Sequence, residues 1–306
     1  MQSFQTIRDY LRHALSSFGR HPIALGHGPD TLWDEALALV FGALDLPPDG
    51  DARLLDARVT PDEGARLMAV IQARIESREP TAYLTGRAWF CGLPFFVDRR
   101  VLIPRSPIGE WLTDLAPEHV SMHRDQPLRF LDLCTGSGCL GIVAASVFPE
   151  STGVLADVDP DALAVCQRNV QWHGLDHALT LCASDGLAAI PPEPFDLILC
   201  NPPYVDAEDM ASLPPEYRHE PMLALASGMD GLDFVRALLA HVRAYLADDG
   251  VLVLEVGNSA SALEAWLGPV IGPLAWVEFS RGGHGVVVLS AADLDAVYCA
   301  FYGGQS

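Results

Sequence analysis

The chain of 306 residues lacks the sequence features of several classes of protein. No stretch approaches the ~20 consecutive apolar residues of a membrane-spanning helix, and the first residues carry charge where a signal peptide has a hydrophobic centre. The seven cysteines form no C-x-x-C pair, which is typical of reduced thiols rather than of a metal or redox site. We therefore expect a cytoplasmic protein with no membrane contact and no bound metal.

Positive charge is also scarce. Nineteen basic residues, all of them arginine, stand against 40 acidic residues and give a net charge of −21. Such a surface would repel a long nucleic acid unless a local basic groove held it, and the sequence contains no basic cluster. We expect no direct binding of nucleic acid. The negative charge either attracts a basic protein partner or serves solubility alone.

Half of the residues are apolar, and residues 1–87 have the pattern of a small helical domain. Apolar residues recur at helical spacing from Ile7 to Phe18, and a second helix is expected over 31–44. Thr60-Pro61-Asp62-Glu63 is a capping box with proline at the first helical position. It precedes a helix whose buried face is predicted to contain Leu67, Val70, Ile71 and Ile75. We expect this domain to recognise the substrate.

Residues 88–106 are rich in aromatic and β-branched side chains, which predicts a β-hairpin linker with Gly92 and Pro94 at its turn. A short helix near 107–115 then begins a second domain, which we place at 107–306. In this domain short apolar strands alternate with helical stretches, the pattern of a parallel sheet covered by helices on both faces. The strands are expected at 128–133, 153–158, 178–183, 195–200 and 251–256.

Two further strands, at 275–279 and 285–289, are expected to form an antiparallel hairpin around Gly282-Gly283-His284-Gly285. The predicted fold class is therefore α/β. It combines a Rossmann-like, mostly parallel, seven-stranded sheet that ends in an antiparallel hairpin with the small N-terminal helical domain.

A glycine-rich turn follows the first strand of the sheet, in the sequence Asp132-Leu133-Cys134-Thr135-Gly136-Ser137-Gly138. Glycines let a ligand approach the backbone, and ligands of such sheets bind at the carboxyl ends of the strands. Gly136-x-Gly138-x-x-Gly141 also matches a dinucleotide fingerprint, so NAD is one candidate. A carboxylate at Asp132 would repel a pyrophosphate but attract the ammonium and sulfonium groups of S-adenosylmethionine. We predict that S-adenosylmethionine is bound by Asp132, Thr135, Gly136, Ser137 and Gly138.

The next strands also end in polar residues. Asp157 follows the second strand, where its carboxylate can hold both hydroxyls of a ribose, and Asp159-Pro160 is expected to cap the next helix. Asp185 follows the third strand, where it either accepts a hydrogen bond from an adenine amino group or is a solvated loop residue. Asn201, after the fourth strand, completes the predicted cofactor site.

The fourth strand runs directly into Asn201-Pro202-Pro203-Tyr204. Two consecutive prolines fix φ and remove two N–H donors, so backbone carbonyls face the ligand. A bound NH₂ group could donate to the Asn201 side-chain oxygen and to the Pro202 carbonyl while Tyr204 stacks on the planar group. These contacts would aim the nitrogen lone pair at the methyl group, so catalysis would consist of orientation and electrostatic stabilisation. We predict that Asn201, Pro202 and Tyr204 are catalytic and that all four residues bind the substrate.

With these motifs the sequence resembles the HemK-like protein-glutamine methyltransferases over nearly its whole length. The resemblance implies a class I methyltransferase domain behind a helical domain, acting on a glutamine side-chain amide. One branch of the family methylates peptide release factors and typically has P-R-P-D-T-E after the hairpin, whereas this chain has P-R-S-P-I-G-E at 104–110. That stretch is similar to the branch that methylates a large-subunit ribosomal protein, as are those at 88–92, 205–210, 216–221 and 225–232.

The resemblance implies a basic ribosomal protein of the large subunit as the partner. Methylation of a release factor remains an alternative, as do methylation of an adenine amino group in nucleic acid and a non-catalytic role in ribosome assembly. Gly186 stands where release-factor enzymes tend to have a bulky aromatic residue, so the adenine contacts are open. The oligomeric state is open too, and Arg105 and Glu110 could either bridge the domains or contact the substrate.

Overall fold

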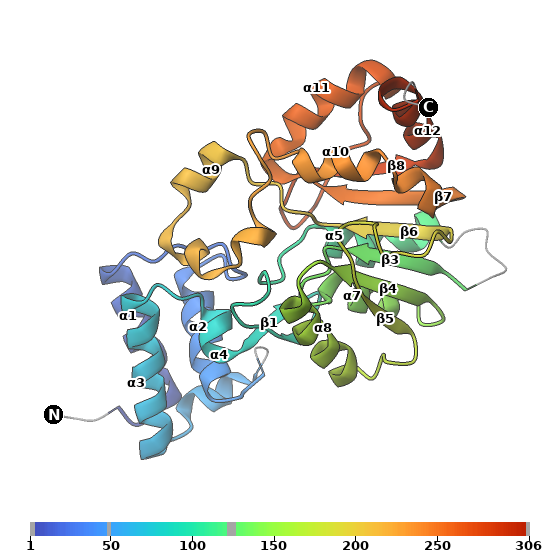
Figure 1. The fold of residues 1–306 in the computed structure, drawn as a ribbon. Coiled ribbons are helices and arrows are strands. Elements are labelled where there is room, and N and C mark those ends of the chain that lie inside the picture. The colour runs from blue at the N-terminus through green and yellow to red at the C-terminus, as the bar shows by residue number, and fades with distance from the viewer. Residues whose placement is uncertain (1–3, 48–49, 121–126, 304–306) are drawn as a thin grey trace.

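The computed structural model describes residues 4–47, 50–120 and 127–303. Its N-terminal part is a unit of helices (Figure 1), and α1, α2 and α3 share a hydrophobic core. Within α3, Leu67 and Ile71 are buried as predicted, whereas Val70 and Ile75 are only partly buried. The unit consists of α1 (Ile7–Arg20), α2 (Leu32–Ala43), the 3-10 turn η1 (Ala52–Asp56), α3 (Pro61–Glu76) and α4 (Thr81–Thr85).

Capping boxes fix where two of these helices begin. At the start of α3, the Thr60 hydroxyl accepts a hydrogen bond from the Glu63 N–H, and the Glu63 carboxylate accepts one from the Thr60 N–H. This confirms the predicted capping box. Thr6 and Asp9 form the same arrangement at the start of α1. In both helices the side chains satisfy N–H groups that a first turn leaves unpaired.

A two-stranded hairpin, β1 (Arg87–Phe90) and β2 (Leu93–Phe96), follows the helical unit. The prediction that Pro94 lies at its turn is wrong, because Cys91 and Gly92 form the turn and Pro94 is inside β2. Proline is tolerated in this position because both strands of a two-stranded hairpin are edge strands. Side chains of both strands belong to the hydrophobic core of the large sheet. The hairpin is therefore packed onto that sheet and is more than a linker.

The helix expected near 107–115 is longer than predicted and contains an irregular turn. It begins with α5 (Ile108–Glu110), passes through the π turn η2 (Trp111–Leu115) and ends with α6 (Ala116–Val120). In the π turn, the Ala116 N–H donates to the Trp111 carbonyl, five residues back. Trp111 and Leu112 are both buried in the core, so this segment anchors the beginning of the part of the chain that contains the large sheet.

Among the described residues the large sheet has six strands, in the order β5-β4-β3-β6-β7-β8. The order reverses between β3 and β6, and ligands of such sheets bind beside this point at the carboxyl ends of the strands. The parallel strands are β3 (Arg129–Leu133), β4 (Thr152–Asp157), β5 (Leu179–Ala183), β6 (Phe195–Cys200) and β7 (Leu246–Glu255), and β8 (Val286–Ser290) is antiparallel to β7.

The predicted seventh strand, and with it the C-terminal hairpin, is not formed. Residues 275–279 run beside β8, where the Val277 N–H donates to the Val286 carbonyl at 2.9 Å. The pairing amounts to one β-bridge, between Trp276 and Val287. The prediction is corrected because an apolar segment becomes a strand only where its backbone pairs over several residues.

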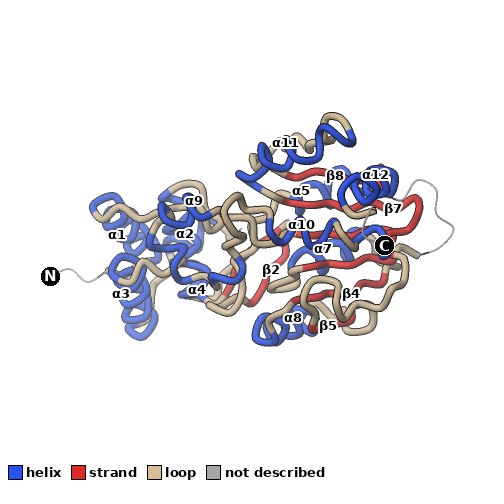
Figure 2. Tube along the Cα trace, turned by 45° about the horizontal axis from the view of Figure 1, so that its top comes forward, coloured by secondary structure: helices blue, strands red, loops and turns tan. Residues whose placement is uncertain are grey.

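Helices cover both faces of the sheet (Figures 1 and 2). Two clusters of buried apolar side chains, one on each face, form the core of this part of the chain. One cluster includes α7 (Cys139–Val147) and α8 (Pro160–Trp172), and the other includes α10 (Asp233–Leu239), α11 (Ala260–Ile271) and α12 (Ala291–Phe301). Within the described ranges, no helix combines the length and apolar character needed to cross a membrane.

The segment between β6 and α10 reaches the N-terminal helices (Figure 1). Its Glu216 is buried and accepts hydrogen bonds from the Ala24 N–H at 2.9 Å, Arg78 at 2.8 Å and Arg74 at 3.3 Å. The loop that follows β6 is thereby fastened to the helical unit. The segment contains α9 (Ala207–Ser212) and the 3-10 turns η3 (Pro215–His219) and η4 (Met222–Ala224).

Candidate active site

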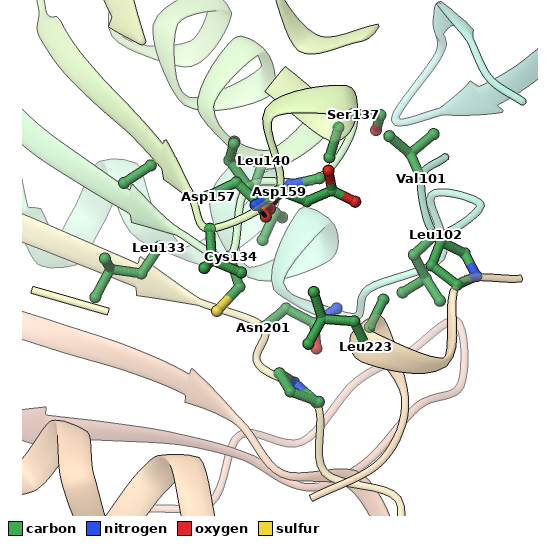
Figure 3. A pocket seen from close by; sticks show the side chains of 18 of the residues that line it. Val101, Leu102, Leu133, Cys134, Ser137, Leu140, Asp157, Asp159, Asn201 and Leu223 are labelled. Carbon is green, nitrogen blue, oxygen red and sulfur yellow. Dashed lines mark hydrogen bonds between the residues drawn. The ribbon is translucent and has the colours of Figure 1, made fainter. Parts of the chain in front are cut away.

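A cavity lies at the carboxyl ends of β3, β4, β5 and β6, where the sequence predicts a nucleoside ligand (Figure 3). Two of the predicted cofactor-binding residues, Asp132 and Gly138, do not line it. The six that do are Thr135, Gly136, Ser137, Asp157, Asp185 and Asn201.

Asp132 and Gly138 shape the glycine turn from behind the cavity wall. Asp132 is fully buried, and its carboxylate accepts hydrogen bonds from the Thr135 hydroxyl at 2.5 Å and the Gly141 N–H at 2.9 Å. Burial raises the pKa of Asp132 to about 7. Gly138 precedes α7 with φ of 82°, and a Cβ there would lie 2.7 Å from the Cys166 sulfur. Both residues therefore brace the turn, and their predicted direct contact with the cofactor stays a prediction.

On the side of the cavity, the backbone of the glycine turn and of the loop after β5 is open to a ligand. Gly136 and Gly186 both line the cavity with φ of 53°, and no described atom lies within 4 Å of a Cβ built on either. Side chains rarely adopt this conformation, so glycine keeps the backbone accessible here. The absence of an aromatic side chain at Gly186 therefore widens the cavity beside the end of β5.

Asp157 is oriented by two backbone groups. One carboxylate oxygen accepts a hydrogen bond from the Gly136 N–H at 2.9 Å and the other accepts one from the Asp159 N–H at 3.0 Å. Burial raises the pKa of Asp157. Asp159 itself caps α8 by accepting from the Asp161 N–H, as predicted. The end of β4 thus presents a carboxylate held in one orientation.

The charges around the cavity do not suit a pyrophosphate. Three aspartates line it, and both arginines on the described part of its wall are already paired, Arg100 with Asp98 and Arg105 with Glu220. The Ser137 hydroxyl is buried on the same wall and has no hydrogen-bond partner among the described residues. Such an orphaned group is free to bind a polar atom of a ligand.

Apolar side chains complete the wall of the cavity, and the sequence did not predict their presence there. Val101, Leu102 and Leu223 lie across it from Cys134 in Figure 3, and Phe234 of α10 lines it as well. These residues belong to irregular segments or to the start of a short helix, so no periodic pattern marks them. They provide apolar surface for the faces of a nucleoside.

A second cavity meets the first at the loop after β6. Pro202 and Tyr204 line the second cavity and Pro203 lines the first. Asn201 lines both, as do Leu102, Arg105 and Ala224. Ligands in the two cavities would therefore meet beside these four residues.

Tyr204 is held in place by its neighbours. Its hydroxyl donates to Glu255 at 2.8 Å, and its carbonyl accepts from the Ser259 hydroxyl at 3.1 Å. A Cβ on Gly257 would lie 2.4 Å from the Tyr204 ring, and one on Gly231 would lie 2.2 Å from the Tyr204 carbonyl oxygen. Sequence reasoning missed Glu255, although it follows an apolar strand as Asp157 does. The stacking predicted for Tyr204 stays a prediction.

Arg105 lies between the two parts of the chain, and Glu110 lies away from both cavities. The Arg105 guanidinium donates to both carboxylate oxygens of the buried Glu220, at 2.6 and 2.8 Å. His27 of the helical unit lies 3.3 Å from the same carboxylate. Burial alone would raise the pKa of Glu220, but His27 and Arg105 lower it to about 2. Glu110 instead binds the turn at 280–281.

Comparison with known proteins identifies the family. Residues 113–213 match the methyltransferase small domain. The ribosomal protein uL3 glutamine methyltransferase of Bordetella pertussis is 48% identical over 297 residues, which cover 96% of this chain and 98% of that protein. The protein of the same name from Burkholderia pseudomallei is 45% identical over 303 residues, covering 96% and 97%. This chain belongs to the uL3 glutamine methyltransferases.

Membership of the uL3 glutamine methyltransferases settles the cofactor. The chain is an S-adenosylmethionine-dependent methyltransferase, and the NAD alternative is set aside. The open backbone at Gly136, the unpartnered Ser137 hydroxyl and the three aspartates fit a cationic nucleoside that has no phosphate.

The catalytic domain of hMettl16, solved with a MAT2A 3′UTR hairpin, shares the fold with a TM-score of 0.50 at 14% identity, covering 93% of this chain and 91% of that one.

Proposed function

We propose that this methyltransferase transfers a methyl group from S-adenosylmethionine to the side-chain amide nitrogen of a glutamine in ribosomal protein uL3, and that Asn201 is the residue where the two substrates meet. The observation that carries the proposal is the position of Asn201 on the walls of both cavities. Methyl transfer requires that the methyl carbon of the donor and the amide nitrogen of the acceptor lie next to each other. The relatives named above act on uL3 by name.

The first cavity would hold the donor, which supplies an electrophilic methyl group on a sulfonium. Asp157 keeps free lone pairs beside those used by the two backbone N–H groups, and these would accept the ribose hydroxyls. Asp185, at the end of β5, would accept a hydrogen bond from the adenine amino group. Thr135, Gly136 and Ser137 would surround the amino-acid end of the donor.

The second cavity would hold the glutamine side chain. An amide nitrogen is a weak nucleophile because its lone pair is delocalised into the carbonyl. The Asn201 side-chain oxygen and the Pro202 carbonyl would accept its two N–H groups and favour a pyramidal nitrogen, while the Tyr204 ring would pack on the amide plane. These residues act by orientation and by stabilising positive charge that develops on the nitrogen. The extra proton of the product is acidic and leaves without a strong base.

The charge of the chain supports this partner. A ribosomal protein is basic because it binds RNA, and a net charge of −21 would attract it. An adenine acceptor in nucleic acid would need a basic surface to hold the strand, and the sequence contains no cluster of basic residues that would form one. We assign recognition of uL3 to the helical domain at 1–87, because Glu216 ties that domain to the loop that carries the acceptor site. We place the reaction in the cytoplasm, where ribosomal proteins are made.

Methyl transfer from a labelled donor to purified uL3 and to DNA tests the proposal. We expect label in uL3 alone, and Asn201→Ala should slow transfer by about 100-fold or more because it removes a preorganised acceptor at the reacting nitrogen. Gln171→Ala, which removes an exposed amide on α8, is the matched control and should retain the rate. Label in DNA but not in uL3, or an undiminished rate in Asn201→Ala, would contradict the proposal.

A further inference from the structure

A buried carboxylate stands in the second cavity without a role in the mechanism described so far. Glu255, at the end of β7, is 3% exposed and lines this cavity together with Asn201 and Tyr204. Burial raises the pKa of Glu255. A charge buried in this way is costly unless hydrogen bonds or an opposite charge stabilise it. The groups around Glu255 must therefore stabilise its charge.

Two hydroxyl groups stabilise the Glu255 carboxylate. Ser106 donates to one oxygen at 2.5 Å and Tyr204 donates to the other at 2.8 Å. The Ser106 oxygen also accepts from the Ile108 N–H at 3.2 Å, which leaves the Ser106 proton for Glu255. Both carboxylate oxygens act as acceptors, as they do in the ionised form.

The bond to Glu255 determines what Tyr204 offers to a substrate. A phenol carries one proton and two acceptor lone pairs. Because the proton is donated to Glu255, only lone pairs remain for a group bound in the cavity. Glu255 and Tyr204 therefore offer acceptors and no hydrogen-bond donor to a bound group. The two N–H groups of a glutamine amide are bound by Asn201 and Pro202 in the proposed function, so Tyr204 contributes by withholding a donor from a carboxylate.

Burial raises the pKa of Glu255, and the nearby positive charge of Arg105 offsets part of that rise, but Arg105 is already bound to another carboxylate. Arg105 donates from both terminal nitrogens to the two oxygens of Glu220, so that pair is neutral as a unit. A carboxylate entering the cavity would meet the like charge of Glu255 and the lone pairs of Tyr204. A carboxamide of the same shape would instead meet partners for its N–H groups.

We propose that Glu255, acting directly and through Tyr204, makes the acceptor cavity select a glutamine amide over a glutamate carboxylate. The proposal rests on the proposed function, because it specifies the chemistry of the same cavity. Ser106 supports the selection because its hydrogen bond favours the ionised form of the Glu255 carboxylate. Glu255 is thus a specificity-determining residue.

Binding measurements with two forms of uL3 test this role. Mass spectrometry of uL3 methylated by the wild-type enzyme locates the modified glutamine, and the second form carries glutamate at that position. Binding of each form is measured by calorimetry with S-adenosylhomocysteine present. The wild type should prefer the glutamine form by about 100-fold or more, as sites that hydrogen-bond a substrate group do. In Glu255→Gln this preference should fall at least about tenfold, and Glu255→Asp should retain part of it.

Controls separate selection from charge and from packing. Glu150→Gln removes an exposed carboxylate before β4 and should keep the wild-type preference. If Glu255 served packing alone, Glu255→Gln would weaken the binding of both forms of uL3 equally. The preference for the glutamine form would then be unchanged, and this result would overturn the proposal. If Glu255→Gln does not fold, Tyr204→Phe removes the phenol oxygen and should also lower the preference; an unchanged preference there would overturn it as well. A wild type that does not methylate uL3 would overturn the proposed function, and this inference with it.

Discussion

Removal of Glu216 should loosen the attachment of the helical unit to the loop after β6. The Glu216 side chain is 0% exposed and accepts hydrogen bonds from the Ala24 N–H, Arg78 and Arg74. Glu216→Ala would leave Arg74, which is 1% exposed, with Glu35 as its remaining carboxylate. Removing one partner of a buried ion pair costs about 3–5 kcal/mol, and three lost hydrogen bonds at about 1 kcal/mol each point to the same range.

Urea unfolding of the wild type and of Glu216→Ala measures this cost. Asp56→Ala is the matched control, because Asp56 forms an exposed ion pair with Arg8 at 3.0 Å, and such pairs contribute at most about 1 kcal/mol. Hydrogen exchange should show lost protection in α3 and in η3 and unchanged protection in the central strands. A loss below about 1 kcal/mol for Glu216→Ala would refute the view that this carboxylate joins the two parts of the chain.

Three further predictions concern the turn, the loop and the charge. Gly231→Ala should cost about 2 kcal/mol or more and slow methyl transfer, since Gly231 has φ of 74° and its Cβ would lie 2.2 Å from the Tyr204 carbonyl oxygen. Gly174→Ala, where φ is 69° and the space around the new Cβ is open, should lower the free energy of unfolding by only about 1 kcal/mol. Urea unfolding and initial rates of methyl transfer compare the two variants. The pKa of Asp132 rises on folding to about 7, from about 3.9 in the unfolded chain. The folded protein therefore retains a proton that the unfolded chain releases, and this contribution to stability falls as the pH rises from about 4 to 7. Asp132→Asn should remove that slope, up to about 1.4 kcal/mol per pH unit, in urea unfolding at several pH values; an unaltered slope would refute the assignment. Binding of uL3 should weaken as salt is raised, because screening removes the attraction to a net charge of −21, and a flat affinity would show that charge does not recruit the partner.

Four of the five parallel strands, and the loops at their ends, could be predicted from the sequence. Strands β3 to β6 begin and end within one residue of their expected bounds, because buried parallel strands are continuous apolar runs. The polar residues after them then fall at one edge of the sheet by topology alone. Asp157 and Asn201 reach the cavity in this way.

Residues whose partners are distant in the sequence could not be predicted. Ser106 and Glu255 are 149 positions apart, and no local pattern indicates that they meet. The sequence shows that Asp132 precedes the turn, but not that its carboxylate binds the Thr135 hydroxyl and the Gly141 N–H within the turn. Residues 275–279 have the apolar pattern of a strand, yet only one bridge forms.

Mass spectrometry of ribosomal protein uL3 from cells that lack this protein tests the central claim most directly. We predict that one glutamine of uL3 loses its methyl group in these cells, that the wild-type chain restores it and that the Asn201→Ala chain does not. Methylation of uL3 that persists without the protein, or that Asn201→Ala restores in full, would contradict the account.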